Sequence, residues 1–206
     1  MTVSKIGAAV TLGNIDTVFG WLCEQNRPME IQDFTPPNIL SSDLSNLMSA
    51  YQEKLQAHQG PRGVHGPFFG LDLGNLEVAF QKLITARLIS SLEICEQLKA
   101  QYMVIHSPFN DWVKLNQWQY PFVQPGIIAA MGDILKAPLQ RATDIGCTLV
   151  LENCDDTDPN MRMRAVREID HPNLKLSVDT GHAHLSHCNY NAPSVVDFIA
   201  ASENLL

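Results

Sequence analysis

Short apolar runs alternate with longer amphipathic stretches along the whole chain. Each run is mostly β-branched or apolar and ends in a polar or turn-forming residue, which is typical of a parallel strand covered on both faces. The pattern predicts six such strands: Lys5–Val10, Met29–Phe34, Gly63–Phe69, Tyr102–Pro108, Thr148–Asn153 and Leu174–Asp179.

The stretches between these runs have the periodicity of amphipathic helices. Pro159 stands where a first helical turn is expected. Met161 and Met163 alternate with Arg162 and Arg164, which indicates a helix with a solvated face. The predicted helices are Thr17–Gln25, Ser42–His58, Leu76–Lys99, Pro125–Asp144, Asp158–Glu168 and Ala192–Leu206.

Repeated strand–helix alternation indicates a parallel sheet with right-handed crossovers. Two architectures fit this pattern: an open doubly wound sheet, or a (β/α)8 barrel that is cut short. The first strand–helix junction, residues 9–14, has no dinucleotide-binding fingerprint, and a phosphate-binding P-loop is absent from the sequence. We therefore predict an α/β fold of the (β/α)8 TIM-barrel type, with about six β/α units in a single domain over residues 1–206.

Residues that can bind metals stand at the ends of four predicted strands: His65, His106, Glu152 and Asp179. In a barrel these ends converge on one mouth, and a carboxylate there is costly to bury unless it is paired or bound to a cation. Each residue alone has another explanation: a structural histidine, a helix cap at Glu152, or a turn at Asp179. Together they favour a metal site, and mixed carboxylate and imidazole ligands suit Zn, Mn, Fe(II), Co or Mg.

Four strings resemble the xylose-isomerase-like TIM barrel superfamily, which includes sugar and sugar-phosphate isomerases and epimerases and AP endonuclease family 2. The strings are His65-Gly66-Pro67-Phe68, Ile105-His106-Ser107-Pro108, Leu151-Glu152-Asn153 and Val178-Asp179-Thr180-Gly181-His182-Ala183. The resemblance implies that Glu152, Asp179 and His182 bind a metal, and that His65 and His106 bind the substrate or a second metal. It also implies a seventh strand with a ligand histidine and an eighth with a glutamate. The sequence to Leu206 has no counterpart for these, so we expect a barrel that is incomplete on its C-terminal side.

By this resemblance the chain is a metal-dependent sugar or sugar-phosphate isomerase or epimerase that acts by proton transfer next to a carbonyl. Glu152 would be both ligand and base, and His182 would orient a hydroxyl or phosphate group. Phe68 and Trp112 belong to loops expected to shape the substrate pocket, although Trp112 suits loop packing equally well. Two alternatives stay open: an endonuclease IV-like zinc phosphodiesterase, and a non-catalytic or incomplete barrel that acts as a binding module.

The composition indicates which classes of partner this protein is expected to bind. A formal net charge of −8 without any basic run argues against a nucleic-acid partner. The sequence shows no signal peptide or bilayer-spanning run, so we expect a cytoplasmic protein without a membrane partner. Five cysteines without a CxxC pair indicate reduced thiols in or near the core. A small sugar-like substrate is expected, and self-association would cover the open edges of an incomplete barrel.

Overall fold

The computed structural model describes residues 6–203, so Lys5 and residues 204–206 of the predicted elements lie outside the described residues. One sheet holds the strands in chain order, and every neighbouring pair is parallel. The strands are β1 (Ala8–Val10), β2 (Met29–Ile31), β3 (Arg62–His65), β4 (Tyr102–His106), β5 (Thr148–Glu152) and β6 (Leu174–Ser177). All six overlap the predicted runs, and the predicted α/β fold is confirmed. Strand β1 ends at Val10 as predicted, whereas the other five strands end one to four residues earlier because the residues after them already belong to loops.

Six α-helices overlap the predicted stretches: α1 (Phe19–Glu24), α2 (Ser45–Lys54), α3 (Val78–Leu98), α5 (Val123–Ile145), α6 (Pro159–Ile169) and α8 (Val195–Ser202). Three 3-10 turns, η1 (Ile15–Thr17), η2 (Ile39–Ser41) and η3 (Leu55–Ala57), accompany them. The sequence pattern missed α4 (Asp111–Asn116) and α7 (Thr180–Tyr190). Helix α7 buries only Ala183 and Ser186, so it has no apolar stripe that would reveal it.

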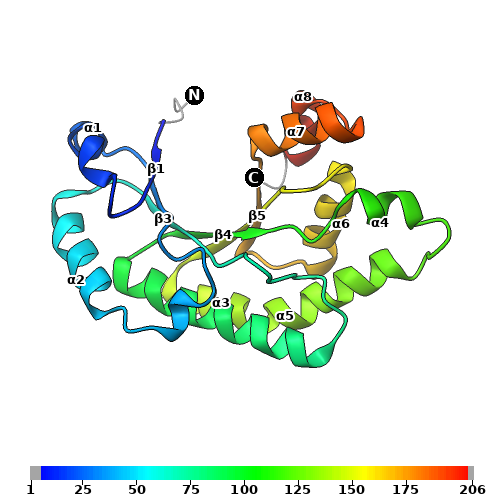
Figure 1. Cartoon of the computed structure of the whole chain (residues 1–206), viewed down its shortest axis with the longest axis horizontal. Helices are drawn as coiled ribbons and strands as arrows, with labels where there is room; N and C mark the ends of the chain where they lie inside the picture. The colour runs from blue at the N-terminus through cyan, green and yellow to red at the C-terminus, as the bar shows by residue number, and fades with distance from the viewer. Residues whose placement is uncertain (1–5, 204–206) are drawn as a thin grey trace.

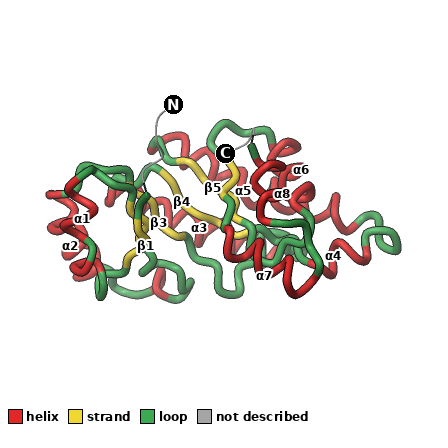
Figure 2. The backbone as a smooth tube through the Cα atoms, turned by 90° about the horizontal axis from the view of Figure 1, so that it is seen from above, coloured by secondary structure: helices red, strands yellow, loops and turns green. Residues whose placement is uncertain are grey.

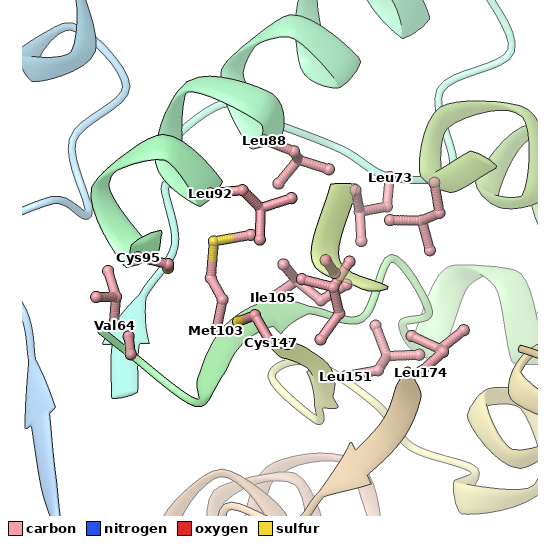
Figure 3. Packing of buried hydrophobic residues seen from close by; sticks show 14 of the residues in the cluster. Val64, Leu73, Leu88, Leu92, Cys95, Met103, Ile105, Cys147, Leu151 and Leu174 are labelled. Carbon is pink, nitrogen blue, oxygen red and sulfur yellow. The ribbon is translucent and has the colours of Figure 1, made fainter. Parts of the chain in front are cut away.

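Helices cover one face of the sheet. Helices α3 and α5 pack against each other and run along the same side of the strands (Figure 1). Leu88 and Leu92 of α3 meet Met103 and Ile105 of β4 in the resulting core (Figure 3). Alternate residues of the strands supply the sheet side of this core: Met29, Ile31, Val64, Met103, Ile105, Leu149, Leu151, Leu174 and Leu176, all of them buried.

The other face of the sheet, here called the polar face, carries polar residues beside Val104 and Val150, so continuous apolarity holds only on the face that the helices cover. Side chains alternate between faces along a strand, and the residues between the buried ones point to this second face. They include Glu30 between Met29 and Ile31, and Lys175 between Leu174 and Leu176. In Figure 2 the strands lie between an end formed by α1 and α2 and an end formed by α4, α6 and α8. The polar face therefore presents side chains from several strands to one common space.

Arg162 of α6 corrects a second expectation, because it is 0% exposed and does not lie on a solvated face. Its guanidinium donates hydrogen bonds to the carbonyl of Leu151 (2.9 Å) and to that of Ser177, and its Nε atom lies 3.9 Å from Asp156 Oδ1. Only Arg164 follows the prediction, since it is exposed and pairs with Glu168. Arg162 thus ties α6 to the ends of β5 and β6.

All five cysteines have free thiols. Cys95 and Cys147 are buried as expected, whereas Cys188 is exposed on α7, contrary to the prediction of a core or near-core position. Within residues 6–203, no helix combines the length and apolarity needed to cross a membrane.

Candidate metal centre

Three neighbouring strands place His65, His106 and Glu152 together. Each is the last residue of its strand, on β3, β4 and β5 respectively. The strand register puts His106 directly opposite Glu152. The side chains of His65, His106 and Glu152 all lie on the polar face of the sheet. The two Nε2 atoms are 3.2 Å apart, and Glu152 Oε2 lies 3.6 Å from His106 Nε2 and 3.9 Å from His65 Nε2. One ligand atom from each residue therefore lies within 4.8 Å of the others, the arrangement of a metal-binding group.

The His65 ring is fixed in orientation. Its Nδ1 atom lies 2.9 Å from the Gly66 carbonyl oxygen, which can only accept, so Nδ1 donates and Nε2 keeps a lone pair. Such a hydrogen bond on the far nitrogen is the usual support for a metal-binding histidine. Phe68 packs on both imidazoles, with its ring centroid 5.1 Å from His65 and stacked 4.4 Å from His106.

Electrostatics keep the two imidazoles neutral. Burial lowers the pKa of His65, and burial together with His65 and His182 lowers the pKa of His106 to about 4. Burial, together with the charges of Asp179 and Glu30, raises the pKa of Glu152 to about 7. At neutral pH the contacts between these histidines and Glu152 are therefore not ion pairs.

These three residues fit a divalent cation. Neutral imidazole nitrogens and a carboxylate oxygen are suitable ligands for zinc and other first-row ions. Ligands about 2 Å from a tetrahedral zinc lie roughly 3.3 Å apart, close to the spacings between these three atoms. A cation would also offset the cost of burying Glu152 among other carboxylates, which its raised pKa reflects.

Asp179 and His182 lie beside this group. Asp179 Oδ1 accepts from the His182 backbone nitrogen (2.7 Å) and so caps the N-terminus of α7, while Oδ2 lies 4.0 Å from His182 Nε2. Asn153 holds the Asp179 backbone through two reciprocal hydrogen bonds of 2.8 and 2.9 Å. The His182 ring centroid is 6.4 Å from that of His106. The group therefore contains Glu152, which was predicted as a metal ligand, and His65 and His106, which were predicted to bind the substrate or a second metal. The metal-binding roles of Asp179 and His182 stay predictions.

The sequence reasoning overlooked Glu30 and Asp156. Glu30, on β2, accepts a hydrogen bond from Gln32 (2.7 Å), and burial raises its pKa. Its signal was a single carboxylate between two buried apolar residues of a strand. Asp156 is buried behind the site, accepts from Ser107 Oγ (2.9 Å), and has a pKa raised by burial to about 6. Asp156 contacts the residue that follows β4, and Arg162 contacts the ends of β5 and β6.

The two predicted pocket residues are placed differently. Phe68 lines a cavity next to His106. Trp112 lies on α4, where it stacks on Tyr120 with ring centroids 6.2 Å apart, and it does not line that cavity. Trp112 is 56% exposed, so its packing on Tyr120 leaves part of the indole open, and both the packing role and the contact with substrate stay predictions.

A curved parallel sheet with candidate metal ligands at the carboxyl ends of its strands defines a partial (β/α) barrel. The family model of the xylose isomerase-like TIM barrel matches residues 25–204 of this sequence. The chain therefore belongs to that family, and the resemblance drawn from its motifs is confirmed. A comparison with curated proteins gave no match.

Several solved structures share the fold. A D-tagatose 3-epimerase-like protein is 20% identical with a TM-score of 0.69, and the match covers 98% of this chain and 72% of that one. A D-psicose 3-epimerase, solved in the presence of D-fructose, is 16% identical with a TM-score of 0.65 and coverages of 98% and 71%. A Thermus thermophilus protein soaked with ZnCl2 is 22% identical with a TM-score of 0.64 and coverages of 87% and 68%. Relative to these structures, the six strands form a partial TIM barrel.

Proposed function

We propose that the chain is a metal-dependent sugar isomerase or epimerase that acts by proton transfer next to a carbonyl. The observation that carries this proposal is the convergence of His65, His106 and Glu152 at three neighbouring strand ends. The fold shared with sugar epimerases supports the proposed class of substrate.

Each residue has a proposed task. His65, His106 and Glu152 would hold a divalent ion, which when bound polarises a carbonyl and favours loss of the neighbouring proton. Glu152 would accept that proton at a carboxylate oxygen and return it to the neighbouring carbon. His182 is partly exposed at the rim of the site, where its ring can donate a hydrogen bond to a substrate hydroxyl. Asp179 would add negative charge beside the ion.

The test combines metal content with proton exchange. The purified chain is analysed for metals, and then incubated with D-fructose in D2O while deuterium at the carbons next to the carbonyl is followed by NMR. Wild type should hold about one divalent ion and exchange deuterium, whereas Glu152→Gln should lose both. Glu93→Gln, on the exposed side of α3, is the matched control and should behave as wild type. Absence of metal from wild type would reject the proposal and favour a binding module.

Zinc phosphodiesterase chemistry is a second candidate, favoured by one observation. The group contains two imidazoles with a single carboxylate, a set that suits zinc better than magnesium. The net charge of −8 opposes it, because phosphodiester substrates are usually bound by clustered cationic side chains. Incision of DNA containing an abasic site, dependent on zinc and lost in Glu152→Gln, would replace the isomerase proposal with this one.

A further inference from the structure

A cavity of about 400 Å³ lies beside the candidate metal centre, between the loops that follow β3, β4 and β5. This volume falls in the range of small-molecule sites, about 300–1,000 Å³. Its walls include Phe68, Phe69, Asp72, His106, Asn110 and Asp155. His106 belongs both to the metal-binding group and to the wall, so the cavity adjoins the proposed reaction site on the side of this residue.

One wall of the cavity is aromatic. Phe69 is 58% exposed, and its ring packs on Phe68 at a centroid distance of 4.2 Å. Phe68 is in turn stacked on His106 at 4.4 Å. Three rings thus lead from the metal-binding group into the cavity. The outermost ring has an exposed surface, and covering it with the C–H face of a sugar ring would remove apolar surface from water.

Other parts of the cavity wall are polar and have free hydrogen-bonding capacity. Asp72 Oδ1 accepts from the Gly74 nitrogen (2.8 Å) and Asn110 Oδ1 accepts from the Val113 nitrogen (3.1 Å), which orients both side chains. Among residues 6–203, neither Asp72 Oδ2, Asn110 Nδ2 nor the Asp155 carboxylate takes part in a further hydrogen bond. These atoms offer both acceptors and a donor, the combination that sugar hydroxyls require.

The charges of the wall exclude anions. Two carboxylates, Asp72 and Asp155, face the cavity, and none of its lining residues is a lysine or an arginine. The nearby Lys114 donates its Nζ hydrogen bond to the Thr157 carbonyl (3.1 Å). A phosphate group held on this wall, away from the proposed ion, would therefore meet like charge without a lysine or arginine partner.

We propose that this cavity binds an uncharged sugar ring of the substrate, with one face on Phe69 and its hydroxyls bonded to Asp72, Asn110 and Asp155, and that it rejects sugar phosphates. The proposal deepens the proposed isomerase function and rests on it for the substrate class. It assigns a neutral sugar where the sequence allowed either a sugar or a sugar phosphate.

Binding is measured apart from turnover, by titration calorimetry or ligand-observed NMR on the whole chain. The probes are methyl β-D-glucopyranoside, which has no carbonyl to react, and D-glucose 6-phosphate. The neutral glycoside should bind at least about tenfold more tightly, a difference of about 1.4 kcal/mol. Phe69→Ala should weaken glycoside binding at least about tenfold, whereas Phe80→Ala, a similarly exposed phenylalanine on α3, should leave it unchanged. Asp155→Lys should narrow or reverse the preference against the phosphate.

Two results would overturn the cavity proposal: equal binding of both probes, or glycoside binding that Phe69→Ala leaves intact. The proposed function fails separately, through absence of metal and of deuterium exchange. Glycoside binding without either would leave the cavity assigned and the isomerase rejected. Metal-dependent deuterium exchange on a sugar phosphate, without binding of the glycoside, would support the isomerase proposal and reject the cavity proposal.

Discussion

The Nε2 atoms of His65 and His106 lie 3.2 Å apart, although 41 positions separate the two residues in the sequence. The two residues end neighbouring parallel strands, so the same edge of the sheet presents both rings. Their pKa values are lowered, so neither ring carries a charge at neutral pH that would repel the other. Two neutral imidazoles and a largely buried carboxylate in one place offer a set of ligand atoms that a cation can share.

Removal of either imidazole should weaken metal binding. Loss of groups that merely support a ligand costs about 10–100-fold in affinity, so His106→Ala, which removes a ligand itself, should raise the zinc Kd by at least about 100-fold. Competition with a chromophoric chelator measures the change. His184→Ala, an exposed histidine on α7, is the control for adventitious surface binding. Equal effects of the two substitutions would contradict the assignment of His106 as a ligand.

The raised pKa of Glu152 predicts that wild type and Glu152→Gln differ in stability by an amount that depends on pH when EDTA keeps the protein free of metal. Its pKa is raised from 4.5 to about 7 on folding, so the folded state favours the protonated acid. Its contribution to stability is therefore fully present below pH 4.5 and is lost as the pH rises through 7. Glu152→Gln removes this dependence, and should become more stable than wild type by about 1–3 kcal/mol at pH 8. Urea unfolding at pH 4.5 and pH 8 measures the difference, and a gap that does not widen with pH would refute it.

Zinc should make wild type more stable than Glu152→Gln at pH 8. A ligand that binds only the folded state raises the free energy of unfolding, and binding here requires the deprotonated carboxylate. With zinc in excess at pH 8, wild type should gain stability while Glu152→Gln gains little. Thermal unfolding with and without zinc measures both shifts. Similar gains in the two proteins would place the metal elsewhere.

Arg162→Met should destabilise the chain by about 3–5 kcal/mol, because it leaves the buried Asp156 carboxylate without its cationic partner. Arg164→Met is the matched control, since its pair with Glu168 is exposed and such pairs contribute about 0.3–0.5 kcal/mol. Adding Asp156→Asn to Arg162→Met should recover part of the loss. Denaturant unfolding gives all three values, and equal effects of the two arginine substitutions would show that Arg162 is not buried as described.

Gly63→Ala tests the packing of the polar face below the metal-binding group. A Cβ atom at Gly63 would overlap the Tyr102 ring on the neighbouring strand, so the ring must move at a cost of about 1–3 kcal/mol. Gly132→Ala, in α5, meets no atom within 4 Å and should instead stabilise the helix by about 0.5–1 kcal/mol. Combining Gly63→Ala with Tyr102→Leu should relieve the clash. Opposite signs for the two glycine substitutions in unfolding experiments are the expected result.

The sequence predicted those features that depend on nearby residues. Apolar runs marked six strands, and Asp158 with Pro159 marked the start of α6. The placement of His65, His106 and Glu152 at strand ends was also visible, because a polar residue after an apolar run is a local signal. In a parallel sheet such ends share one edge, so their approximate convergence followed from the fold class alone.

Only the tertiary structure decided which of these residues meet. Strand register brings His106 opposite Glu152, and register depends on hydrogen bonds between segments far apart in the sequence. Burial is likewise a long-range property: Arg162 is enclosed because carbonyl groups of β5 and β6 surround it, and nothing in its own helix indicates this. Helix α7 begins at its Asp179 cap without an apolar stripe. Local patterns determine what a segment becomes, whereas contacts between distant segments decide which side chains share a site.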